Sequence, residues 1–311
     1  MCLSLLAVVL WAVAASVQAQ DQPHASRVMS FNIRFDEAEG YLSPKENSWI
    51  SLSGKHRRDL VLQMVSDFDP DILCLQEPLM NQVQDIRRML TKHGFYGVGR
   101  DDGKQTGEYC AILFRRSRFE PVDQGTFWLN EQADQPGSRY PKTCCARIAS
   151  WIILNDLLAE GRELVVLNTH WDHQIQDSRL FSAVLIRKRL PELAGDRPIL
   201  VMGDLNVPPE NPAFTQLVTP TQENPLRLID SYRSVYPLPE PIDEVRDQFR
   251  LRAEEGTFNN FKGWTYGNRI DFILHSKHFR TLEAGIVRFN KEGRYPSDHF
   301  PVTATLQLLT D

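Results

Sequence analysis

The chain of 311 residues has little cysteine, five residues in all, and Cys2 lies in an N-terminal apolar stretch. The other four do not have the spacing of a zinc motif. Cys74 and Cys110 lie within apolar runs and are predicted to be buried thiols. Cys144 and Cys145 are adjacent and would pair with each other only under strain. One disulfide is therefore compatible with the sequence, but a disulfide-built scaffold is excluded.

An excess of positive charge is also missing, since 35 Lys and Arg face 40 Asp and Glu, for a formal net charge of −5. A mildly acidic protein gains little binding energy from long-range attraction to polyanions. Any binding of nucleic acid must therefore be local and assisted by a metal. The sequence has no fixed-period repeat, no low-complexity tract and no convincing linker. We therefore expect one domain with a large core.

The run Leu3 to Ala15 is apolar but too short to span a bilayer comfortably. Val17 and Ala19 follow it and suit cleavage after Ala19, so we expect residues 1–19 to be a signal peptide and 20–311 the folded domain. An uncleaved anchor is the alternative, because no basic residue precedes the run. No later segment has membrane-spanning character. We expect an exported monomer, periplasmic or extracellular, with no transmembrane segment after the signal is removed.

Apolar runs of strand length recur along the chain and are separated in places by helical stripes. The runs cover residues 28–33, 71–76, 96–99, 109–114, 149–154, 164–168, 199–202, 269–274, 285–289 and 302–308. The helical stripes lie within 60–68, 83–90 and 181–190, and prolines at 191, 198, 208 and 209 interrupt the chain after the third. Strands outnumber helices, which favours an α+β protein with two packed sheets over one parallel sheet.

Short polar peptides adjoin the ends of six of these apolar runs. They are Ser30-Phe31-Asn32-Ile33-Arg34, Leu75-Gln76-Glu77, Asn168-Thr169-His170, Gly203-Asp204-Leu205-Asn206, Arg269-Ile270-Asp271 and Ser297-Asp298-His299. Any one of them alone is explained equally well as a turn or a cap. Six together indicate one convergent site. Carboxylates and carboxamides are ligands for a hard divalent metal, and imidazoles suit a phosphate, so the set predicts phosphoester hydrolysis.

The ordered set resembles the endonuclease/exonuclease/phosphatase superfamily, which includes deoxyribonuclease I, exonuclease III-type repair nucleases, neutral sphingomyelinases, inositol polyphosphate 5-phosphatases and carbon-catabolite-repressor-type deadenylases. The motifs run in the family's order from Asn32 to His299. The resemblance implies a four-layer αββα sandwich of two mixed β-sheets flanked by helices, with the site at one rim. The segments 125–129 and 168–173 look most similar to secreted bacterial members related to the deadenylases.

The resemblance also implies how the site binds its metal and its water. Glu77 resembles the principal metal ligand, Asp298 a second metal-side carboxylate, and Asn32 the asparagine near the metal and the attacking water. The expected metal is Mg²⁺, with Mn²⁺ as an alternative. Asp204 and Asn206 resemble the pair that orients or activates the water and contacts the phosphate.

The histidines are expected to act on the phosphate and on the leaving group. His170 resembles the phosphate-binding or leaving-group histidine, and His299 the paired catalytic imidazole. Asp271 resembles the acid that holds His299 in its working tautomer, and Glu108 the acid that steadies His170. Glu108 is alternatively a solvated loop residue. The general base is either Asp204 or His299.

Three further residues are candidates for substrate contact. Arg147 resembles a phosphate-contacting arginine, although the match rests on one residue. Arg34 is expected either to touch the substrate phosphate or to pair with a surface acid. Asp172 is expected to share a face with His170, which gives it either a substrate role or a supporting one.

Three functions are compatible with these residues. The first, and the one that we expect, is a metal-dependent phosphodiesterase or nuclease that activates water for attack on phosphorus, with nucleic acid as a candidate substrate. The second is a phospholipase C-like (sphingomyelinase-type) or phosphomonoesterase activity on a lipid or sugar phosphate. The third is an inactive binding protein on the same scaffold, which is disfavoured because each aligned catalytic position has the expected residue type.

Overall fold

The computed structural model describes residues 25–45, 47–238 and 254–310, which form two six-stranded sheets. Sheet 1 has the order β11-β12-β1-β2-β4-β3 and sheet 2 the order β5-β6-β7-β8-β10-β9. Sheet 1 contains β1 (Ala25–Asn32), β2 (Ile72–Gln76), β3 (His93–Tyr96), β4 (Cys110–Arg115), β11 (Phe279–Ile286) and β12 (Val302–Leu308). Sheet 2 contains β5 (Phe119–Trp128), β6 (Ile148–Asp156), β7 (Arg162–His170), β8 (Ile199–Asp204), β9 (Ile229–Asp230) and β10 (Asp271–His275). Both sheets are mixed, because β1 pairs with β2 and β7 with β8 in parallel while their other pairs are antiparallel.

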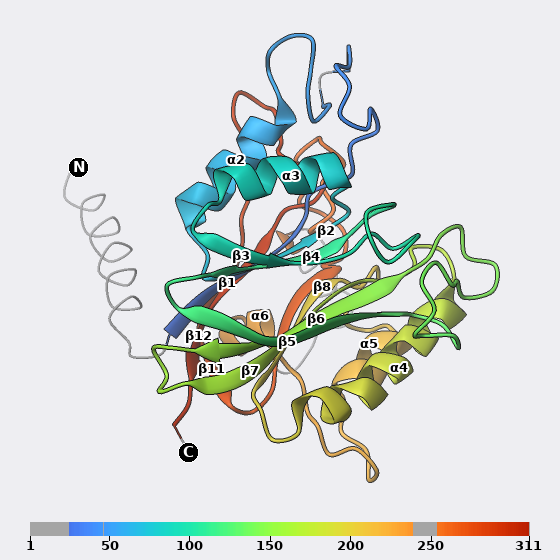
Figure 1. The fold of residues 1–311 in the computed structure, drawn as a ribbon, viewed down its shortest axis with the longest axis vertical. Helices are drawn as coiled ribbons and strands as arrows, with labels where there is room; N and C mark the ends of the chain where they lie inside the picture. The colour runs from blue at the N-terminus through green and yellow to red at the C-terminus, as the bar shows by residue number, and fades with distance from the viewer. Residues whose placement is uncertain (1–24, 46, 239–253, 311) are drawn as a thin grey trace.

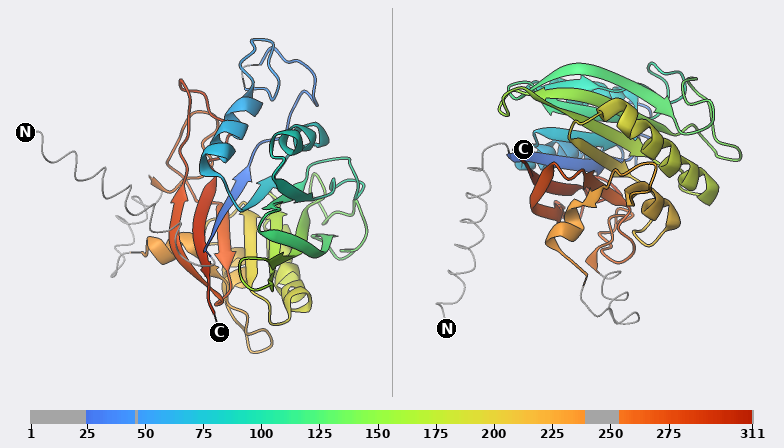
Figure 2. Two further views of the ribbon diagram at one scale, coloured as in Figure 1. Left: turned by 60° about the vertical axis from the view of Figure 1, so that its left-hand side comes forward. Right: turned by 90° about the horizontal axis from the view of Figure 1, so that it is seen from below.

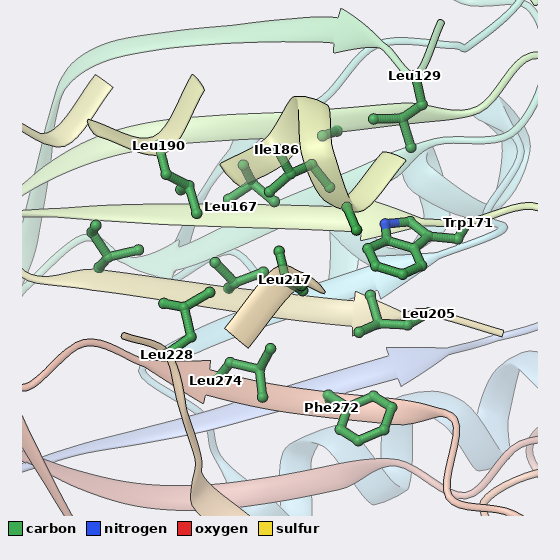
Figure 3. Close-up of a cluster of buried hydrophobic side chains, with 14 of the residues drawn as sticks. Leu129, Leu167, Trp171, Ile186, Leu190, Leu205, Leu217, Leu228, Phe272 and Leu274 are labelled. Carbon is green, nitrogen blue, oxygen red and sulfur yellow. The ribbon is translucent and has the colours of Figure 1, made fainter. Parts of the chain in front are cut away.

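The sheets pack face to face and helices cover the outer faces, which confirms the predicted αββα sandwich (Figure 1). The helices are α2 (Arg57–Phe68), α3 (Met80–Met89), α4 (Gln176–Ala194), α5 (Pro212–Val218) and α6 (Ser231–Val235). Helices α2 and α3 lie against sheet 1 through an apolar cluster that includes Val61 and Leu73. Helices α4 and α5 lie against sheet 2 through Ile186, Leu217 and their neighbours (Figure 3).

The layer between the sheets is apolar over most of its length and polar near the site. Val28 and Ile72 of sheet 1 share one buried cluster with Ile152 and Met202 of sheet 2. Closer to the rim, Nε2 of Gln76 donates to Oδ1 of Asn168 at 2.7 Å and so links β2 to β7. The polar pair fixes the registration of the two sheets, because buried amides must find partners.

The strand register brings the predicted motifs to one edge of the sandwich. In sheet 1 the parallel pairing sets Asn32 opposite Gln76, so Asn32 and Glu77 leave the sheet together. In sheet 2 His170 lies opposite Asp204, and Asp204 lies opposite Asp271. Strand β12 runs antiparallel to β1, so the residues just before it also reach this edge. Figure 2 shows β1 and β12, from opposite ends of the chain, side by side.

Helix α4 continues one turn beyond the proline at which the sequence was expected to interrupt it. Pro191 has no N–H to donate to the carbonyl of Arg187, four residues earlier. That carbonyl instead accepts a hydrogen bond of 2.8 Å from Nδ2 of Asn224. A side chain from elsewhere in the fold thus replaces the missing helical bond, and the helix ends at Gly195, whose φ is +54°.

Several strand and helix boundaries differ from the sequence expectation. Strands β3 and β11 begin earlier than the predicted 96–99 and 285–289, and β5 was not predicted. Strand β5 is an edge strand whose residues 120–124 are exposed, and its register shifts between Pro121 and Asp123. An exposed edge with a proline lacks the apolar alternation that identifies a strand. The short helices α5 and α6 were missed for a similar reason, since neither has a long apolar stripe.

Two sequence predictions concern residues that the structure does not describe. The predicted signal peptide, residues 1–19, lies outside the described residues, as does most of the Pro-, Glu- and Asp-rich stretch 236–247, whose composition predicts a surface loop or a short irregular insertion. Among the helices in the described ranges, none is both long and apolar enough to cross a membrane.

Candidate active site

A pocket of about 770 Å³ opens at the rim where the motifs meet. Most of the predicted site residues line it: Arg34, Glu77, Glu108, Arg147, His170, Asp204, Asn206, Asp298 and His299. Asn32 and Asp271 are fully buried and hydrogen-bond to residues that line it. Asp172 is also fully buried, and its carboxylate faces Arg147. The predicted set therefore converges, although it spans residues 32 to 299 of the sequence.

Asn32 joins the two halves of the site. Its Nδ2 donates to Oε1 of Glu77 at 2.9 Å and to Oδ2 of Asp204 at 3.0 Å. Its Oδ1 accepts from the backbone N–H of Arg34 at 3.0 Å. Glu77 follows a strand of sheet 1 and Asp204 ends a strand of sheet 2, so this one amide fixes the distance between carboxylates that different sheets contribute.

Glu77 and Asp298 both face the guanidinium of Arg34. The nearest atoms of Arg34 lie 3.7 Å from Oε2 of Glu77 and 3.8 Å from Oδ2 of Asp298. Both Glu77 (φ 70°) and Arg34 (φ 56°) have left-handed backbone conformations, which are strained for residues with a side chain. The Glu77 carboxylate also accepts from the backbone N–H of Phe35 at 3.1 Å. The Arg34 loop is thus folded tightly over the two predicted metal ligands.

Arg57 fixes the Arg34 loop through hydrogen bonds to backbone carbonyls, and it was not predicted as a site residue. It is buried, and its guanidinium donates to the carbonyl oxygens of Ile33, Arg34 and Pro296, the latter two at 2.9 and 3.1 Å. Burial lowers the pKa of Arg57 to about 10, even though nearby carboxylates oppose the shift. One cation therefore ties the segment after β1 to the segment that carries Asp298. In the sequence it sits in an Arg-Arg pair that resembles surface charge.

Three buried ionisable side chains lie next to one another in the site, those of Asp204, Asp271 and His299. Nδ1 of His299 lies 2.9 Å from Oδ2 of Asp271, and Nε2 lies 3.8 Å from Oδ2 of Asp204. Burial lowers the pKa of His299, but Asp271 and then Asp204 outweigh it and raise the pKa to about 10. Burial and repulsion by Asp271 raise the pKa of Asp204 to about 7. Near neutral pH the imidazole is therefore protonated while the Asp204 carboxyl is close to its midpoint.

His170 lies on the other side of Asp204, with Nε2 3.5 Å from Oδ2 of that residue. Burial, together with the charges of Arg147 and Arg100, holds the pKa of His170 well below its usual range, so this imidazole is neutral. Its Nδ1 is 3.9 Å from Oε2 of Glu108, which is longer than a hydrogen bond. Glu108 instead forms a bidentate pair with Arg100 at 2.6 and 2.8 Å. Burial nevertheless raises the pKa of Glu108 to about 7.

Asn206 and Arg147 complete the wall of the pocket. The backbone N–H of Asn206 donates to Oδ1 of Asp204 at 2.9 Å, and its Nδ2 donates to the carbonyl of Trp171 at 3.1 Å. Arg147 is buried, and Nη2 donates to Nδ1 of His173 at 2.9 Å. Nε and Nη1 of Arg147 are buried without a hydrogen-bond partner. They are therefore donors that are not satisfied by the protein.

The donor set at the rim fits a hard divalent cation. Glu77, Asp204 and Asp298 are all buried, and burial raises the pKa values of Asp204 and Asp298, which means that their negative charges lack full compensation. Ligand-type atoms of Asp204, Asp271 and His299 also lie within 4.8 Å of one another, and Oδ1 of Asp271 has no hydrogen-bond partner. Carboxylate and carboxamide oxygens are the ligands that Mg²⁺ and Mn²⁺ prefer.

The two-sheet sandwich brings paired carboxylates and histidines together at one rim, which is the arrangement that hydrolysis of a phosphoester requires. The chain belongs to the Endonuclease/Exonuclease/phosphatase family, whose model matches residues 29–299. A crystal structure of an endonuclease/exonuclease/phosphatase from Bacteroides vulgatus is 32% identical, with a TM-score of 0.75 over 92% of this chain and 99% of that chain. A mannosyl-6-phosphatase from Bacteroides thetaiotaomicron is 31% identical, with a TM-score of 0.74 over 90% and 99% of the two chains.

Deadenylase-type proteins are also similar, at lower identity. The 3'-5'-exoribonuclease subunit of the CCR4-Not complex from Mycosarcoma maydis is 26% identical over 277 residues, which are 82% of this chain. The chain spans only 40% of the length of that protein, and 30% of an uncharacterised mimivirus protein that is 27% identical. These findings confirm the predicted family and its relation to the deadenylases.

Some residues that shape the pocket were not singled out from the sequence. Arg100 pairs with Glu108, while Trp264 and Tyr266 also line the pocket. Cys144 and Cys145 line the pocket as well, and all four cysteines of the described chain are free thiols. Such residues carry no local motif, and only the fold places them at the rim.

Proposed function

We propose that this phosphoester hydrolase is a divalent-metal-dependent phosphomonoesterase, and that its substrate is a sugar phosphate or another small polar phosphate ester. The observation that carries the proposal is the pocket itself. Its volume of about 770 Å³ suits a small ligand rather than a folded polymer. Three arginines, Arg34, Arg100 and Arg147, line it, and they provide positive charge for one phosphate.

The aromatic residues that line the pocket suit a leaving group that contains a ring. The rings of Trp264 and Tyr266 are stacked, with centroids 5.3 Å apart and planes at 29°. Tyr266 is 57% exposed and Phe258 is 41% exposed, although both are aromatic. Exposed aromatic faces at a pocket rim offer an apolar surface with a polar edge, which suits the C–H face of a sugar ring.

Glu77 and Asp298 are the residues that would hold the metal, and Asn32, whose Nδ2 donates to Glu77, would keep that carboxylate in place. A divalent cation there supplies charge neutralisation at the phosphoryl oxygens and lowers the pKa of a water molecule. Mg²⁺ is the expected ion because these donors are oxygen atoms. Arg34, which faces both carboxylates in the described structure, would turn towards the phosphate.

Asp204 is the proposed general base and His299 the proposed general acid. A carboxyl group with a pKa of about 7 can accept a proton near neutral pH. An imidazolium with a pKa of about 10 is protonated at that pH and can donate to the oxygen of the leaving group. Neutral His170 would donate a hydrogen bond to a phosphoryl oxygen. Of the two bases that the sequence left open, the proposal takes Asp204.

The family comparisons support both a phosphatase and a nuclease, so a phosphodiesterase is the second candidate. The mannosyl-6-phosphatase covers nearly all of this chain, and this chain covers nearly all of it. The exoribonuclease subunits match a smaller part of longer proteins. We therefore prefer the monoester, and nucleic acid becomes the alternative substrate instead of the first choice that the sequence alone suggested.

A substrate panel distinguishes the candidates. Mannose 6-phosphate, glucose 6-phosphate, bis(p-nitrophenyl) phosphate and a short oligonucleotide would be incubated with the protein, Mg²⁺ or Mn²⁺, and then a chelator. We expect phosphate release from a sugar phosphate that is lost with the chelator and in Asp204→Asn. Trp264→Ala should raise KM for that substrate about tenfold with a small effect on kcat, as expected for lost stacking. Faster cleavage of the oligonucleotide than of any monoester would overturn the proposal.

Export and the monomeric state are proposals as well. Expression of the full chain in a bacterial host, followed by N-terminal sequencing of the extracytoplasmic fraction, tests cleavage after Ala19. Retention of the intact chain in the membrane fraction would favour the uncleaved anchor instead. Light scattering of the purified protein tests the monomer.

A further inference from the structure

A cluster of sulfur, nitrogen and oxygen donors lies on the pocket wall, apart from the carboxylates of the predicted metal site. Sγ of Cys144 and Sγ of Cys145 are 3.0 Å apart, and both are free thiols. Cys144 is exposed and Cys145 half-buried, so a small ion can reach both. Donor atoms of Cys144, Asp172 and His173 lie within 4.8 Å of one another. The cluster comes from two segments, the residues before β6 and those after β7.

The carboxylate of Asp172 carries an unsatisfied oxygen in this cluster. Asp172 is fully buried. Its Oδ1 accepts from the backbone N–H groups of Gln174 and Ile175 at 2.9 and 2.6 Å. Its Oδ2 is buried without any hydrogen-bond partner. A buried anionic oxygen that has an ion pair at 3.8 Å with Nε of Arg147 but no hydrogen bond can still accept a bond to a cation.

His173 already has the tautomer that a metal ligand needs. Nη2 of Arg147 lies 2.9 Å from Nδ1 of His173, and an arginine can only donate, so Nδ1 presents its lone pair and the ring proton is on Nε2. Nε of the same guanidinium lies 3.8 Å from Oδ2 of Asp172. Arg147 thus places a positive charge against both donors without making a hydrogen bond to the carboxylate. A cation that bound here would replace Arg147 as the positive charge next to Nδ1 of His173 and Oδ2 of Asp172.

We propose that Cys144, Asp172 and His173 bind a second, borderline-soft divalent cation, Zn²⁺ or Cd²⁺, at the wall of the pocket, and that Cys145, whose Sγ lies 3.0 Å from that of Cys144, turns to join them as the fourth ligand. Two thiolates, one imidazole and one carboxylate are a four-coordinate set that selects Zn²⁺ over Mg²⁺. Each thiol that binds releases its proton to solvent, so the affinity rises with pH. The site does not depend on the substrate proposed above, because none of its four ligands is assigned to the hydrolytic step.

Cobalt is a suitable probe, because Co²⁺ bound to thiolate has a sulfur-to-metal charge-transfer absorption in the near ultraviolet that oxygen ligands do not give. Reduced protein would be titrated with Co²⁺ and then with Zn²⁺. We expect the absorption to saturate at one equivalent and to disappear when Zn²⁺ displaces Co²⁺. Cys144→Ser/Cys145→Ser should abolish it, and His173→Gln should weaken Co²⁺ binding at least about tenfold. Glu77→Gln is the matched control at the oxygen site and should leave the absorption unchanged.

A second measurement keeps the test valid if a variant does not fold. Zn²⁺ should slow alkylation of the wild-type protein by iodoacetamide at Cys144, detected by mass spectrometry of the peptide. The proposal is overturned if the wild type shows no charge-transfer absorption, if the absorption persists in the double cysteine variant, if His173→Gln binds Co²⁺ as tightly as the wild type, or if Zn²⁺ does not protect Cys144.

Discussion

Replacement of Asp271 by asparagine removes the charge that keeps His299 protonated while it changes the shape of the site very little. Oδ2 of Asp271 lies 2.9 Å from Nδ1 of His299, and both side chains are buried. Asparagine has almost the same volume and retains an oxygen that can accept from Nδ1. The substitution therefore tests the charge of Asp271 rather than the packing around it.

The size of the effect follows from the pKa of His299. A pKa of about 10 instead of the ordinary 6.5 corresponds to roughly 5 kcal/mol in favour of the imidazolium. Asp271 makes the largest contribution to this rise, ahead of Asp204, and burial opposes both. Without Asp271 the imidazole should be largely neutral in mildly alkaline solution. Loss of a positioned general acid typically costs 10²- to 10⁴-fold, so we expect kcat to fall about 10³-fold.

The assay is the dependence of kcat and kcat/KM on pH, measured from about pH 6 to about pH 10 with saturating metal. In the wild type, activity should rise as Asp204 ionises through its pKa of about 7 and fall as His299 loses its proton near 10. In Asp271→Asn the falling limb should move to lower pH. Asp156→Asn is a matched control, because Asp156 is also buried and pairs with Arg118 at 2.9 Å but does not line the pocket.

The reasoning fails if Asp271→Asn keeps the falling limb of the wild type and loses less than about threefold in kcat. It also fails if Asp156→Asn shifts the limb as much as Asp271→Asn does. A lower kcat with an unshifted pH profile would mean that Asp271 orients His299 without setting its charge.

Three further predictions concern stability and metal removal. Arg57→Met should lower the free energy of unfolding in urea by about 3–5 kcal/mol, because it strips five backbone carbonyls of a charged donor, and Arg58→Met is the half-buried control. Asp204→Asn should raise the Tm by about 2–4 °C at about pH 8, because a carboxyl whose pKa is raised from 3.8 to about 7 destabilises the fold when ionised. The gain should vanish as the pH falls towards 3.8, and an equal gain at acid pH would contradict this. Chelation should abolish turnover and lower the Tm, since it leaves Glu77 and Asp298 uncompensated, and an unchanged Tm would argue against a structural role for the metal.

The sequence was sufficient to predict the architecture and nine of the residues that line the pocket, because the informative residues lie at strand ends. Asn32, Glu77, His170 and Asp204 each close a buried run, and strand register alone then brings them together. The identity of a residue at a strand end can be read from the sequence around it, without knowledge of distant contacts. The family and its four-layer sandwich could therefore be recognised before any contact was known.

Other features depend on distant contacts and have no local signal. Arg57 reads as half of a charged surface pair, and only the fold shows that it is buried and donates to five backbone carbonyl groups. Glu108 was expected to steady His170, but the structure gives its hydrogen bonds to Arg100, which no motif identified. Strand β5 has no apolar face along its exposed middle, so the periodicity of apolar residues could not identify it as a strand. The roles of individual site residues and the export of the protein stay predictions.

The amide of Asn32 has a consequence for how this enzyme can change. Nδ2 of Asn32 hydrogen-bonds to two carboxylates that opposing sheets carry. The spacing of the reactive groups therefore depends on the thickness of the apolar layer between the two sheets. Enlarging or trimming a side chain in that layer, such as Met202 or Ile152, would tilt one sheet against the other and misalign the chemistry from a distance. Turnover should consequently be more sensitive to repacking of the interior than the melting temperature is.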